Sequence, residues 1–294
     1  MSNKVLVIGA INIDLFATVT DSINLEDSNP AIINIGYGGV GGNIASNLSR
    51  CGIDTHFLTV LGDDYFQEGI DKHYQSLGIS LSESIVLKNT RSNIYLAIMD
   101  QTHDLFLGLN DMELINHLTL DVLKTKHDYI DQFDYLVIDN NLTIDALSYL
   151  LKTFQHKTIF IDAVSASKAP KLQNMFQYIN VLKVNHLELS VLSDKPDLAS
   201  KMTDLLSRGI ETLIVTNKDL DIHLQTNTSR LTVKPIRIDN IINASGAGDA
   251  FISGYIFGRI NGKTDIESLN DAKKLAHLTL QVKESTNEKV NLNE

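Results

Sequence analysis

The sequence predicts an α/β protein built on a doubly wound, mainly parallel sheet, and three observations predict it. Short β-branched runs alternate along the chain with amphipathic stretches of helical length. Gly52, Gly78 and Gly209 each follow a helical pattern, as left-handed helix C-caps do. Hydrophobic residues make up 43% of the chain and charged residues 21%, which is enough apolar surface for a folded core. We therefore expect the 294 residues to form one domain, 1–294.

Six apolar runs are the candidate strands of the main sheet. Each run is short and is separated from the next by a helical pattern, an alternation that is typical of parallel sheets. The six runs are Val5–Ile8, Phe57–Leu61, Tyr135–Ile138, Thr158–Ile161, Val181–Val184 and Thr212–Val215.

Three segments fall outside this alternation. Residues 11–37 and 92–109 have strand character without intervening helices, with side chains alternating in Ile94–Met99. These two segments predict a small antiparallel sheet, which we call the lid, over the carboxyl edge of the main sheet, where open α/β proteins bind ligands. The third segment, the polar tail 284–294, is expected to be partly loose.

Charge and cysteine content narrow the possible partners. The 36 acidic and 25 basic residues give a formal charge of −11, which disfavours binding to nucleic acid and to anionic membrane surfaces. The N-terminal apolar run Val5–Ile8 is too short for a signal peptide, and no run reaches membrane-spanning length. The single cysteine, Cys51, has no partner for a disulfide. These features predict a cytoplasmic protein, in which an anionic substrate would need a local cradle of backbone amides or a metal ion.

The most informative motif is the segment 243–251, followed by an apolar helical pattern. Gly246, Ala247 and Gly248 open this helix, so that free backbone N–H groups and the helix dipole together predict an anion hole. Asp249 follows directly, and a carboxylate beside an anion site suits a general base. The alternative is that Asp249 only caps the helix and that the glycines serve packing.

A second glycine cluster, 36–42, precedes a helix predicted over Ile44–Arg50. Gly38 and Gly39 belong to a run whose backbone entropy cost is hard to explain in a plain connection. Close approach to a polar ligand explains the run better, and Asn43 adds a side-chain donor and acceptor there. A flexible hinge for the lid is the alternative.

Two polar pairs each allow two interpretations. Asn12 and Asp14 share one face of an extended segment, where they suit vicinal hydroxyl groups or an exposed lid edge. Asn185 and Glu188 fall one helical turn apart after a strand. Their oxygens suit a hydrated Mg²⁺, but an ordinary capping box has the same pattern.

Together, in this order and over essentially the whole chain, these four elements resemble the ribokinase-like carbohydrate and nucleoside kinase family. The resemblance implies a three-layer α/β/α fold with a β lid, and a reaction that uses ATP and Mg²⁺, with K⁺ left open. It implies that two segments contact the sugar: the glycine-rich cluster with Asn43, and the Asn-x-Asp segment with Asn12 and Asp14. It also implies that Asn185 and Glu188 support the metal and the phosphates through water. Ser245 and the Gly-Ala-Gly-Asp segment would supply the phosphate site and base. A homodimer through the lid is also implied.

A narrower resemblance points to the pseudouridine kinase branch of that family. It is carried by the segments 38–45, 95–100, 110–112, 139–142, 161–165 with Lys168, and 278–280. The implied acceptor is the ribose 5′-hydroxyl of a C-nucleoside, with Tyr95, Asn141, Asp162 and Lys168 as substrate-binding candidates. Each of these also has a structural interpretation, and Asp162 with Lys168 would then be a surface pair.

The sequence departs from the family pattern at three places. Gly42 stands where the branch usually carries Arg, and Asn243-Ala244 stands where the family has Asp-Thr. Thr216-Asn217-Lys218 replaces the Thr-Leu-Gly of the nucleotide loop. We expect nucleotide handling to be most affected, with Thr216 still at the nucleotide and Lys218 bringing a cation near the phosphates.

Two rival functions remain from the sequence. A kinase of the same fold acting on another sugar or nucleoside differs only in lid and strand-end residues. A non-catalytic nucleoside sensor would have lost ATP through the altered nucleotide loop, although Asp249 argues against it. A Rossmann-type dehydrogenase is disfavoured because Val5–Gly9 is not followed by a Gly-x-Gly-x-x-Gly turn.

Overall fold

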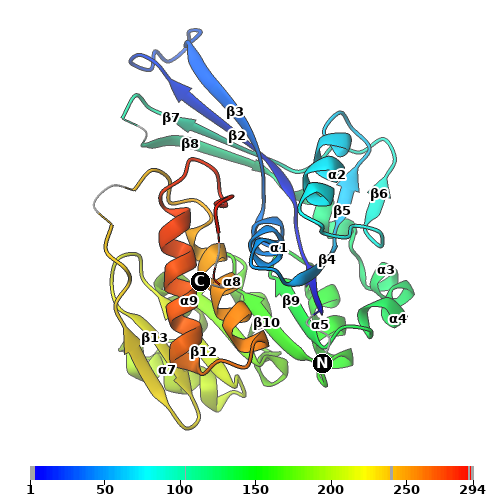
Figure 1. Ribbon diagram of the computed structural model, residues 1–294, viewed down its shortest axis with the longest axis vertical. Coiled ribbons are helices and arrows are strands. Elements are labelled where there is room, and N and C mark those ends of the chain that lie inside the picture. The colour runs from blue at the N-terminus through cyan, green and yellow to red at the C-terminus, as the bar shows by residue number, and fades with distance from the viewer. Residues whose placement is uncertain (1–3, 103, 239–240, 291, 293–294) are drawn as a thin grey trace.

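The computed structural model describes residues 4–102, 104–238, 241–290 and 292. Its largest sheet has the strand order β14-β13-β12-β11-β10-β9-β1-β4 (Figure 1). From β4 to β12 neighbouring strands run parallel, whereas β13 pairs antiparallel with both β12 and β14. The bounds are β1 Lys4–Ile8, β4 Asp54–Leu58, β9 Tyr135–Asp139, β10 Thr158–Asp162, β11 Val181–Asn185, β12 Thr212–Thr216, β13 Ile222–Thr226 and β14 Arg230–Val233. The predicted doubly wound, mainly parallel sheet is confirmed.

One predicted strand is wrong in its extent. The run Phe57–Leu61 divides, because β4 ends at Leu58 and the chain then leaves the main sheet. Val60–Gly62 forms β5, which pairs parallel with β6 (Ile85–Leu87) in a separate two-stranded sheet. One continuous apolar run therefore contributes strands to two sheets. Hydrophobic periodicity alone does not show where the first strand ends and the second begins.

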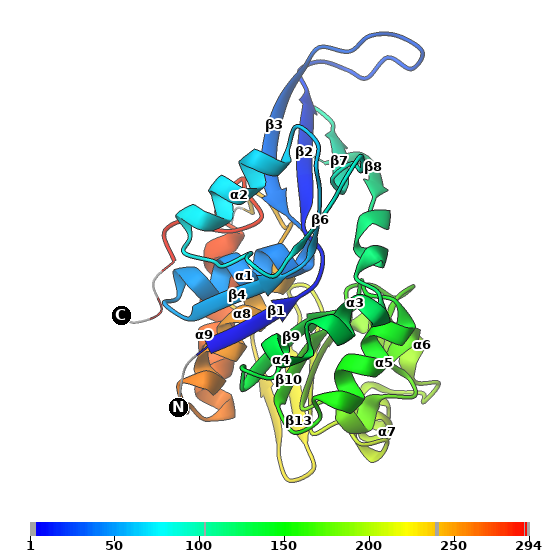
Figure 2. The same cartoon turned by 90° about the vertical axis from the view of Figure 1, so that its right-hand side faces the viewer.

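Helices cover both faces of the main sheet (Figure 2). Val5 and Val7 pack with the core under one set of helices, whereas Leu6 and Ile8 pack with the core under the other. The first set is α1 Val40–Arg50, α2 Gln67–Ser76, α8 Ala247–Ile260 and α9 Asp265–Thr279; the second is α3 Leu120–Thr125, α4 His127–Ile130, α5 Ile144–Thr153, α6 His186–Leu192 and α7 Leu198–Ser207. No helix in the described part of the chain is long and apolar enough to span a membrane.

The lid is a four-stranded sheet that projects from the main body (Figure 1). Its order is β3 (Ala31–Gly38), β2 (Asn12–Val19), β7 (Ile94–Met99), β8 (Leu105–Asp111). The expectation of an antiparallel lid is wrong for one pair, because β2 and β7 run parallel while the outer two pairs are antiparallel. The lid consists of two hairpins, β2–β3 and β7–β8, and in each of them the first strand runs away from the main body. Because these first strands, β2 and β7, lie side by side, they run parallel.

The C-terminal segment, residues 284–290 and 292, is not loose. Ser285, Thr286 and Asn287 are buried, and Val290 and Leu292 join the core beneath α1, α8 and α9. The expectation of a loose tail failed because polar composition does not reveal the side-chain hydrogen bonds that a segment makes with distant helices.

Candidate active site

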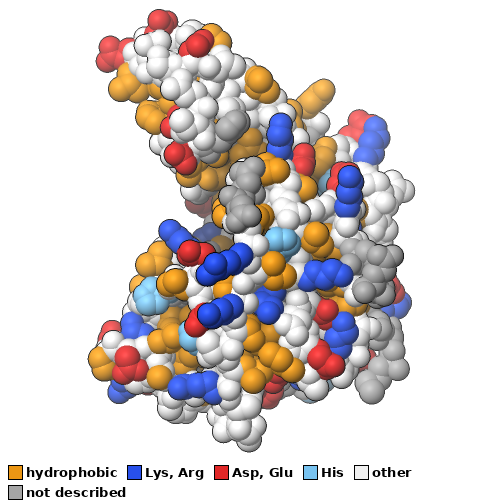
Figure 3. All heavy atoms as spheres, turned by 60° about the vertical axis from the view of Figure 1, so that its left-hand side comes forward, with side chains coloured by type: hydrophobic (Ala, Val, Ile, Leu, Met, Phe, Trp, Pro, Cys, Tyr) orange, Lys and Arg blue, Asp and Glu red, His pale blue; other side chains and the backbone are white. Residues whose placement is uncertain are grey.

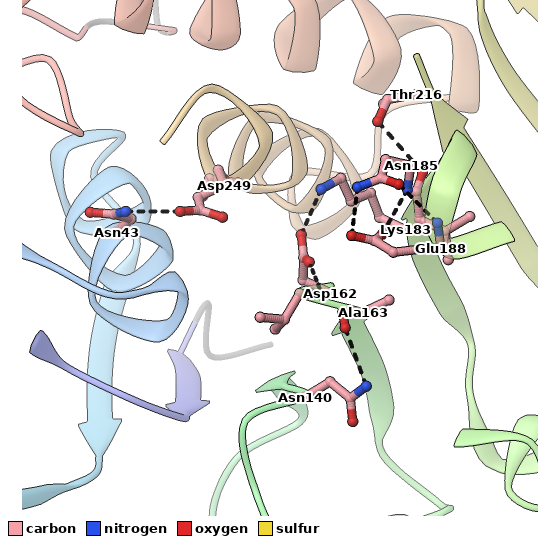
Figure 4. Close-up of polar contacts among 12 residues, drawn as sticks. Asn43, Asn140, Asp162, Ala163, Lys183, Asn185, Glu188, Thr216 and Asp249 are labelled. Carbon is pink, nitrogen blue, oxygen red and sulfur yellow. Dashed lines mark hydrogen bonds and ion pairs between the residues drawn. The ribbon is translucent and has the colours of Figure 1, made fainter. Parts of the chain in front are cut away.

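Four neighbouring parallel strands end in polar residues at one edge of the main sheet. Strands β9, β10, β11 and β12 end at Asp139, Asp162, Asn185 and Thr216. Parallel strands present their carboxyl ends at the same edge, where ligands bind in open α/β sheets. The helices α1 and α8 begin close to this edge (Figure 4).

Asp249 lies in the first turn of α8 and faces α1. Asn43 Nδ2 donates a hydrogen bond of 2.8 Å to Asp249 Oδ2 (Figure 4). Helix α1 begins at Val40, earlier than the predicted Ile44, so Asn43 lies inside its first turn. Burial, together with the charge of Asp162, raises the pKa of Asp249 to about 7, against the opposing effects of Asn43 and Lys183. Such a carboxyl can take up and release a proton near neutral pH.

The turn before α8 has the backbone that an anion hole requires. Gly246 has φ +75, and a Cβ there would stand 1.9 Å from the Ser285 carbonyl oxygen, so only glycine fits. The N–H groups of Gly248 and Asp249 belong to the first helical turn and have no intrahelical acceptor. The Ala247 N–H reaches the Ala244 carbonyl only at 3.4 Å.

Ser245 plays a different part in this turn from the residues that follow it. Its N–H donates to Asn243 Oδ1 at 2.8 Å, and Asn243 Nδ2 donates to the Lys283 carbonyl at 2.7 Å. The Ser245 amide thus shapes the turn, and the predicted phosphate contact of this residue stays a prediction for its hydroxyl.

Lys183 is a buried charge that the sequence analysis missed. Its Nζ lies 2.9 Å from Asp162 Oδ2, with the two side chains only 8% and 2% exposed (Figure 4). Burial lowers the pKa of Lys183, but Asp162, Glu188 and Asp249 outweigh burial and hold it above its usual value. Its Nζ would be 3.0 Å from a Cβ at Gly248, so it also lies against the start of α8. The available signal was a lysine inside the apolar run Val181–Val184.

The predicted Asp162–Lys168 pair is wrong. Asp162 and Lys183 are register partners on β10 and β11, which brings that lysine to the carboxylate. Lys168 Nζ instead donates to Asn141 Oδ1, so these two substrate-binding candidates do lie together.

Asn12 and Asp14, the candidates for binding the sugar, are buried at the base of the lid. Asn12 Nδ2 donates to Asp14 Oδ1, and the two residues are 4% and 5% exposed, which excludes an exposed lid edge. A Cβ at Gly38 would stand 2.1 Å from Asp14 Oδ2, and one at Gly39 2.6 Å from Asn12 Oδ1. The glycine cluster therefore lets the backbone approach this polar pair. Tyr95 is the register partner of Asp14 on β7.

Asp139 is a buried carboxylate that the sequence analysis did not select. It accepts hydrogen bonds from the N–H groups of Ala10, Gly41 and Asn141 at 2.7, 3.0 and 2.8 Å. Burial raises its pKa, while these three donors lower it. Asp139 thus joins the exit of β1, the start of α1 and the end of β9, which are the segments that place the acceptor candidates.

Asn185 and Glu188 form a capping box at the start of α6. Asn185 Oδ1 accepts from the Glu188 N–H at 2.9 Å, and Glu188 Oε2 accepts from the Asn185 N–H at 2.7 Å. Asn185 Nδ2 also donates to Glu188 Oε1 at 2.6 Å (Figure 4). The capping interpretation is confirmed, and a metal ion held here would be reached through water. Within the described ranges, no three His, Cys, Asp or Glu residues gather as a metal cage.

The altered nucleotide loop follows β12. Thr216 Oγ1 donates weakly to the Val184 carbonyl at 3.5 Å, and Lys218 is exposed with φ +50. A groove of about 670 Å³ lies beside this loop. Its polar lining is of mixed charge and consists of His186, Asn217, Asp219, Asp221, His223, Lys234 and Arg237. Lys218 itself does not line the groove.

The fold and the site define a phosphotransferase with an alcohol acceptor. An aspartate in the first turn of a helix, beside free amides and hydrogen bonded to Asn43 of α1, suits the deprotonation of a hydroxyl next to a phosphate. The chain belongs to the pfkB family of carbohydrate kinases, whose model matches residues 2–291. It is a ribokinase-like sugar or nucleoside kinase that uses ATP.

Individual relatives agree with this family. A pseudouridine kinase from Escherichia coli is 27% identical over 96% of this chain and 92% of its own. A carbohydrate kinase structure from Agrobacterium tumefaciens is 28% identical, with a TM-score of 0.87 over 98% of this chain and 94% of that one. An Escherichia coli chain solved in complex with ATP and Mg²⁺ shares the fold at 16% identity, with a TM-score of 0.85 over 98% of this chain and 96% of that one.

Proposed function

We propose that the protein transfers the γ-phosphoryl group of ATP to the 5′-hydroxyl of pseudouridine, in the cytoplasm and with Mg²⁺. The observation that carries the proposal is the Asn43–Asp249 contact, which joins the glycine-rich acceptor segment to the start of α8. The pseudouridine branch motifs and the Escherichia coli pseudouridine kinase support the choice of acceptor.

In the proposed reaction Asp249 orients the 5′-hydroxyl and accepts its proton. With a pKa of about 7, the carboxylate accepts the proton late, as the oxygen–phosphorus bond forms, which suits a loose transition state. The N–H groups at the start of α8 stabilise charge on the transferring oxygens, an effect of about 3–4 kcal/mol per well-placed donor in a well-formed hole. Lys183 balances the acidic groups around this point.

The acceptor is held from the lid and from the ends of the strands. Asn12 and Asp14 bind the ribose hydroxyls, with Asn43 and the amides of Gly38 and Gly39 close by. The nucleobase of the substrate has four candidate binding residues: Tyr95, Asn141, Asp162 and Lys168. Of these, Asn141 and Lys168 lie together and would bind the base as a pair, whereas Asp162 is paired with Lys183.

The residues fit a Mg²⁺ ion held with the nucleotide. Both carboxylate oxygens of Glu188 are hydrogen bonded to Asn185, which leaves their other lone pairs for water ligands. Mg²⁺ usually keeps several waters and takes its remaining ligands from substrate phosphates. The ion would supply charge neutralisation on the phosphates. Thr216, Ser245 and the groove beside Asn217 would bind the rest of the nucleotide.

The direct test is product analysis with a panel of acceptors. Pseudouridine, uridine, adenosine, ribose and fructose are each incubated with the protein and Mg²⁺·ATP, with and without K⁺, and products are identified by mass. We expect pseudouridine 5′-phosphate and ADP as the main products. Preferred phosphorylation of another acceptor would identify a different kinase of the family, and binding without ADP release would identify a sensor.

We also propose a homodimer through the lid. Four apolar side chains on one face of the lid are between 43% and 64% exposed, and orange side chains lie along the edges of the projecting lid in Figure 3. They are Ile33, Ile35, Leu107 and Leu109. An exposed apolar patch of this kind marks an interaction surface.

A further inference from the structure

The C-terminal segment follows a fixed path from the end of α9 towards the base of the lid (Figure 1). Arg50 Nη1 of α1 donates to Thr286 Oγ1 at 2.5 Å. Asn287 Nδ2 donates to the Leu278 carbonyl of α9 at 2.7 Å. The segment is thus held from two helices, although it contains no helix or strand of its own.

Ser285 contacts both halves of the proposed active site. Its Oγ donates to Asp14 Oδ2 at 3.1 Å, across 271 residues of sequence. Its carbonyl oxygen packs against Gly246, the N-cap of α8, so closely that no side chain fits there. Ser285 therefore directly links Asp14, the carboxylate proposed to bind the substrate hydroxyls, to the turn before α8, which is the proposed anion hole.

We propose that Ser285 is a positioning residue for acceptor binding. Its hydroxyl keeps Asp14 ionised and oriented, and its backbone fixes the distance between Asp14 and the start of α8. This role rests on the proposed acceptor site at Asp14.

The surroundings of Asp14 explain why one hydroxyl matters. Within the described residues, no lysine or arginine forms an ion pair with Asp14, and its side-chain donors are the neutral groups of Asn12 and Ser285. Burial raises the pKa of Asp14 to about 6, and the two hydrogen bonds oppose that rise. Loss of either donor favours the protonated form further.

The elements packed around Asp14 bring few other ionisable groups. Strand β3 presents Gly36 and Gly38, and β7 presents Tyr95 in register. Helix α2 contributes Tyr74, whose pKa is raised mainly by burial and in part by Asp14. A carboxylate offers about four acceptor positions, so two remain for ribose hydroxyls while Asn12 and Ser285 hold the others.

The kinetic test compares Ser285→Ala with Ser285→Thr and with Thr286→Val. Thr286 anchors the same segment through Arg50 but does not contact Asp14, so its variant controls for loosening of the segment. We expect Ser285→Ala to raise the acceptor KM at pH 7 at least about threefold, with the KM for ATP unchanged, since one donor to a carboxylate is lost. The acid limb of kcat/KM for the acceptor should move to higher pH. Ser285→Thr should restore it, and Thr286→Val should leave it in place.

A stability measurement tests the contact without any activity. Because the hydroxyl favours the ionised form of Asp14, Ser285→Ala should lower the free energy of unfolding more at pH 8 than at pH 5. In an Asp14→Asn background this difference between the two pH values should vanish.

The outcomes of these experiments test the role of Ser285 separately from the proposed acceptor site at Asp14. An equal loss of stability at both pH values in the wild-type background would overturn the proposed role of Ser285. So would a normal acceptor KM in Ser285→Ala while Asp14→Asn raises that KM. A normal acceptor KM in Asp14→Asn itself would instead overturn the acceptor site, and the role of Ser285 with it.

Discussion

At the scale of single residues, Asp249 is the group on which the proposed chemistry depends. Replacement by asparagine removes the proton acceptor but keeps the shape of the side chain and a partner for Asn43. We expect Asp249→Asn to lower kcat at least about a hundredfold, the range of general-base catalysis, with acceptor affinity largely retained. Steady-state kinetics and calorimetric titration of the acceptor measure the two effects.

Asp131→Asn is a matched control, because Asp131 is an exposed carboxylate near α4 that contacts Lys157 and His156 instead of the site. Its kinetics should match those of the wild type. Near-normal turnover in Asp249→Asn would remove the base assignment.

The pH dependence of turnover follows from the pKa of Asp249. Burial, and then Asp162, raise that pKa to about 7, and the carboxyl must be ionised to accept the hydroxyl proton. We therefore expect kcat to rise with pH and to level off above about 7, as a pH profile of kcat would show. The double variant Asp162→Asn/Lys183→Met removes the two charges of this buried ion pair but leaves Asp249 buried. The rise of kcat with pH should therefore persist in it. A kcat that stays flat from pH 5 to 8 would contradict this prediction.

The Asp162–Lys183 pair makes a separate prediction about stability. Lys183→Met alone leaves Asp162 as an unpaired buried charge, which costs about 3–5 kcal/mol of unfolding free energy. The double variant Asp162→Asn/Lys183→Met removes both charges, so its loss should be much smaller. Urea unfolding of the three proteins measures this, and equal losses in the single and double variants would show that the pairing is not the cause.

At the scale of elements, the nucleotide loop after β12 holds Lys218 in a left-handed conformation with φ +50. A side chain there costs about 1–2 kcal/mol relative to glycine. Lys218→Gly should therefore raise stability by up to about 1 kcal/mol, after the added entropy of the unfolded chain is subtracted. If Lys218 brings its cation to the phosphates, the same variant raises the KM for ATP several-fold.

Glu26→Gly is the control for this prediction. Glu26 also has a positive φ, of 66, but lies in the hairpin between β2 and β3. It should gain similar stability with an unchanged KM for ATP. An unchanged KM in Lys218→Gly would remove Lys218 from the nucleotide site.

The same element scale shows what the sequence could predict. Strand ends and helix starts are local, so periodicity and glycine positions indicated the sheet edge, α8 and the Asn185–Glu188 turn. The Asp162–Lys183 pair depends on the register between β10 and β11, and the bonds of Asp139 join three segments. Such contacts between distant segments leave no local pattern, so they became visible only in the structure.

Gly42 shows the same limit in a single residue. It stands where the related branch usually carries Arg, and a Cβ there would lie 2.3 Å from the hydroxyl of the buried Tyr74. Tyr74 lies on α2, 32 positions further along the chain, so the reason for the glycine lies outside its own motif.

At the scale of the whole molecule, the lid carries both the proposed acceptor-binding residues and the proposed dimer interface. Its base carries Asn12 and Asp14, while its outer strands carry the exposed apolar face. A two-fold symmetric interface uses each residue twice, so one substitution changes two contact positions in the dimer. Burial of each large aliphatic side chain contributes about 1.5–3 kcal/mol. The proposed dimer should thus be sensitive to few substitutions.

We therefore predict that Ile33→Glu/Leu107→Glu raises the dimer dissociation constant at least about a hundredfold, because it places four unpaired carboxylates in the interface. Sedimentation velocity across a concentration series measures the change. Ile144→Glu, at an exposed isoleucine of similar accessibility at the start of α5, should leave the association unchanged. A wild-type protein that stays monomeric at high concentration, or a lid variant that still dimerises normally, would place the interface elsewhere. Because Asp14 lies on β2, an inner strand of the lid that pairs with the outer strand β3, a monomeric lid variant should also show a raised acceptor KM with an unchanged KM for ATP.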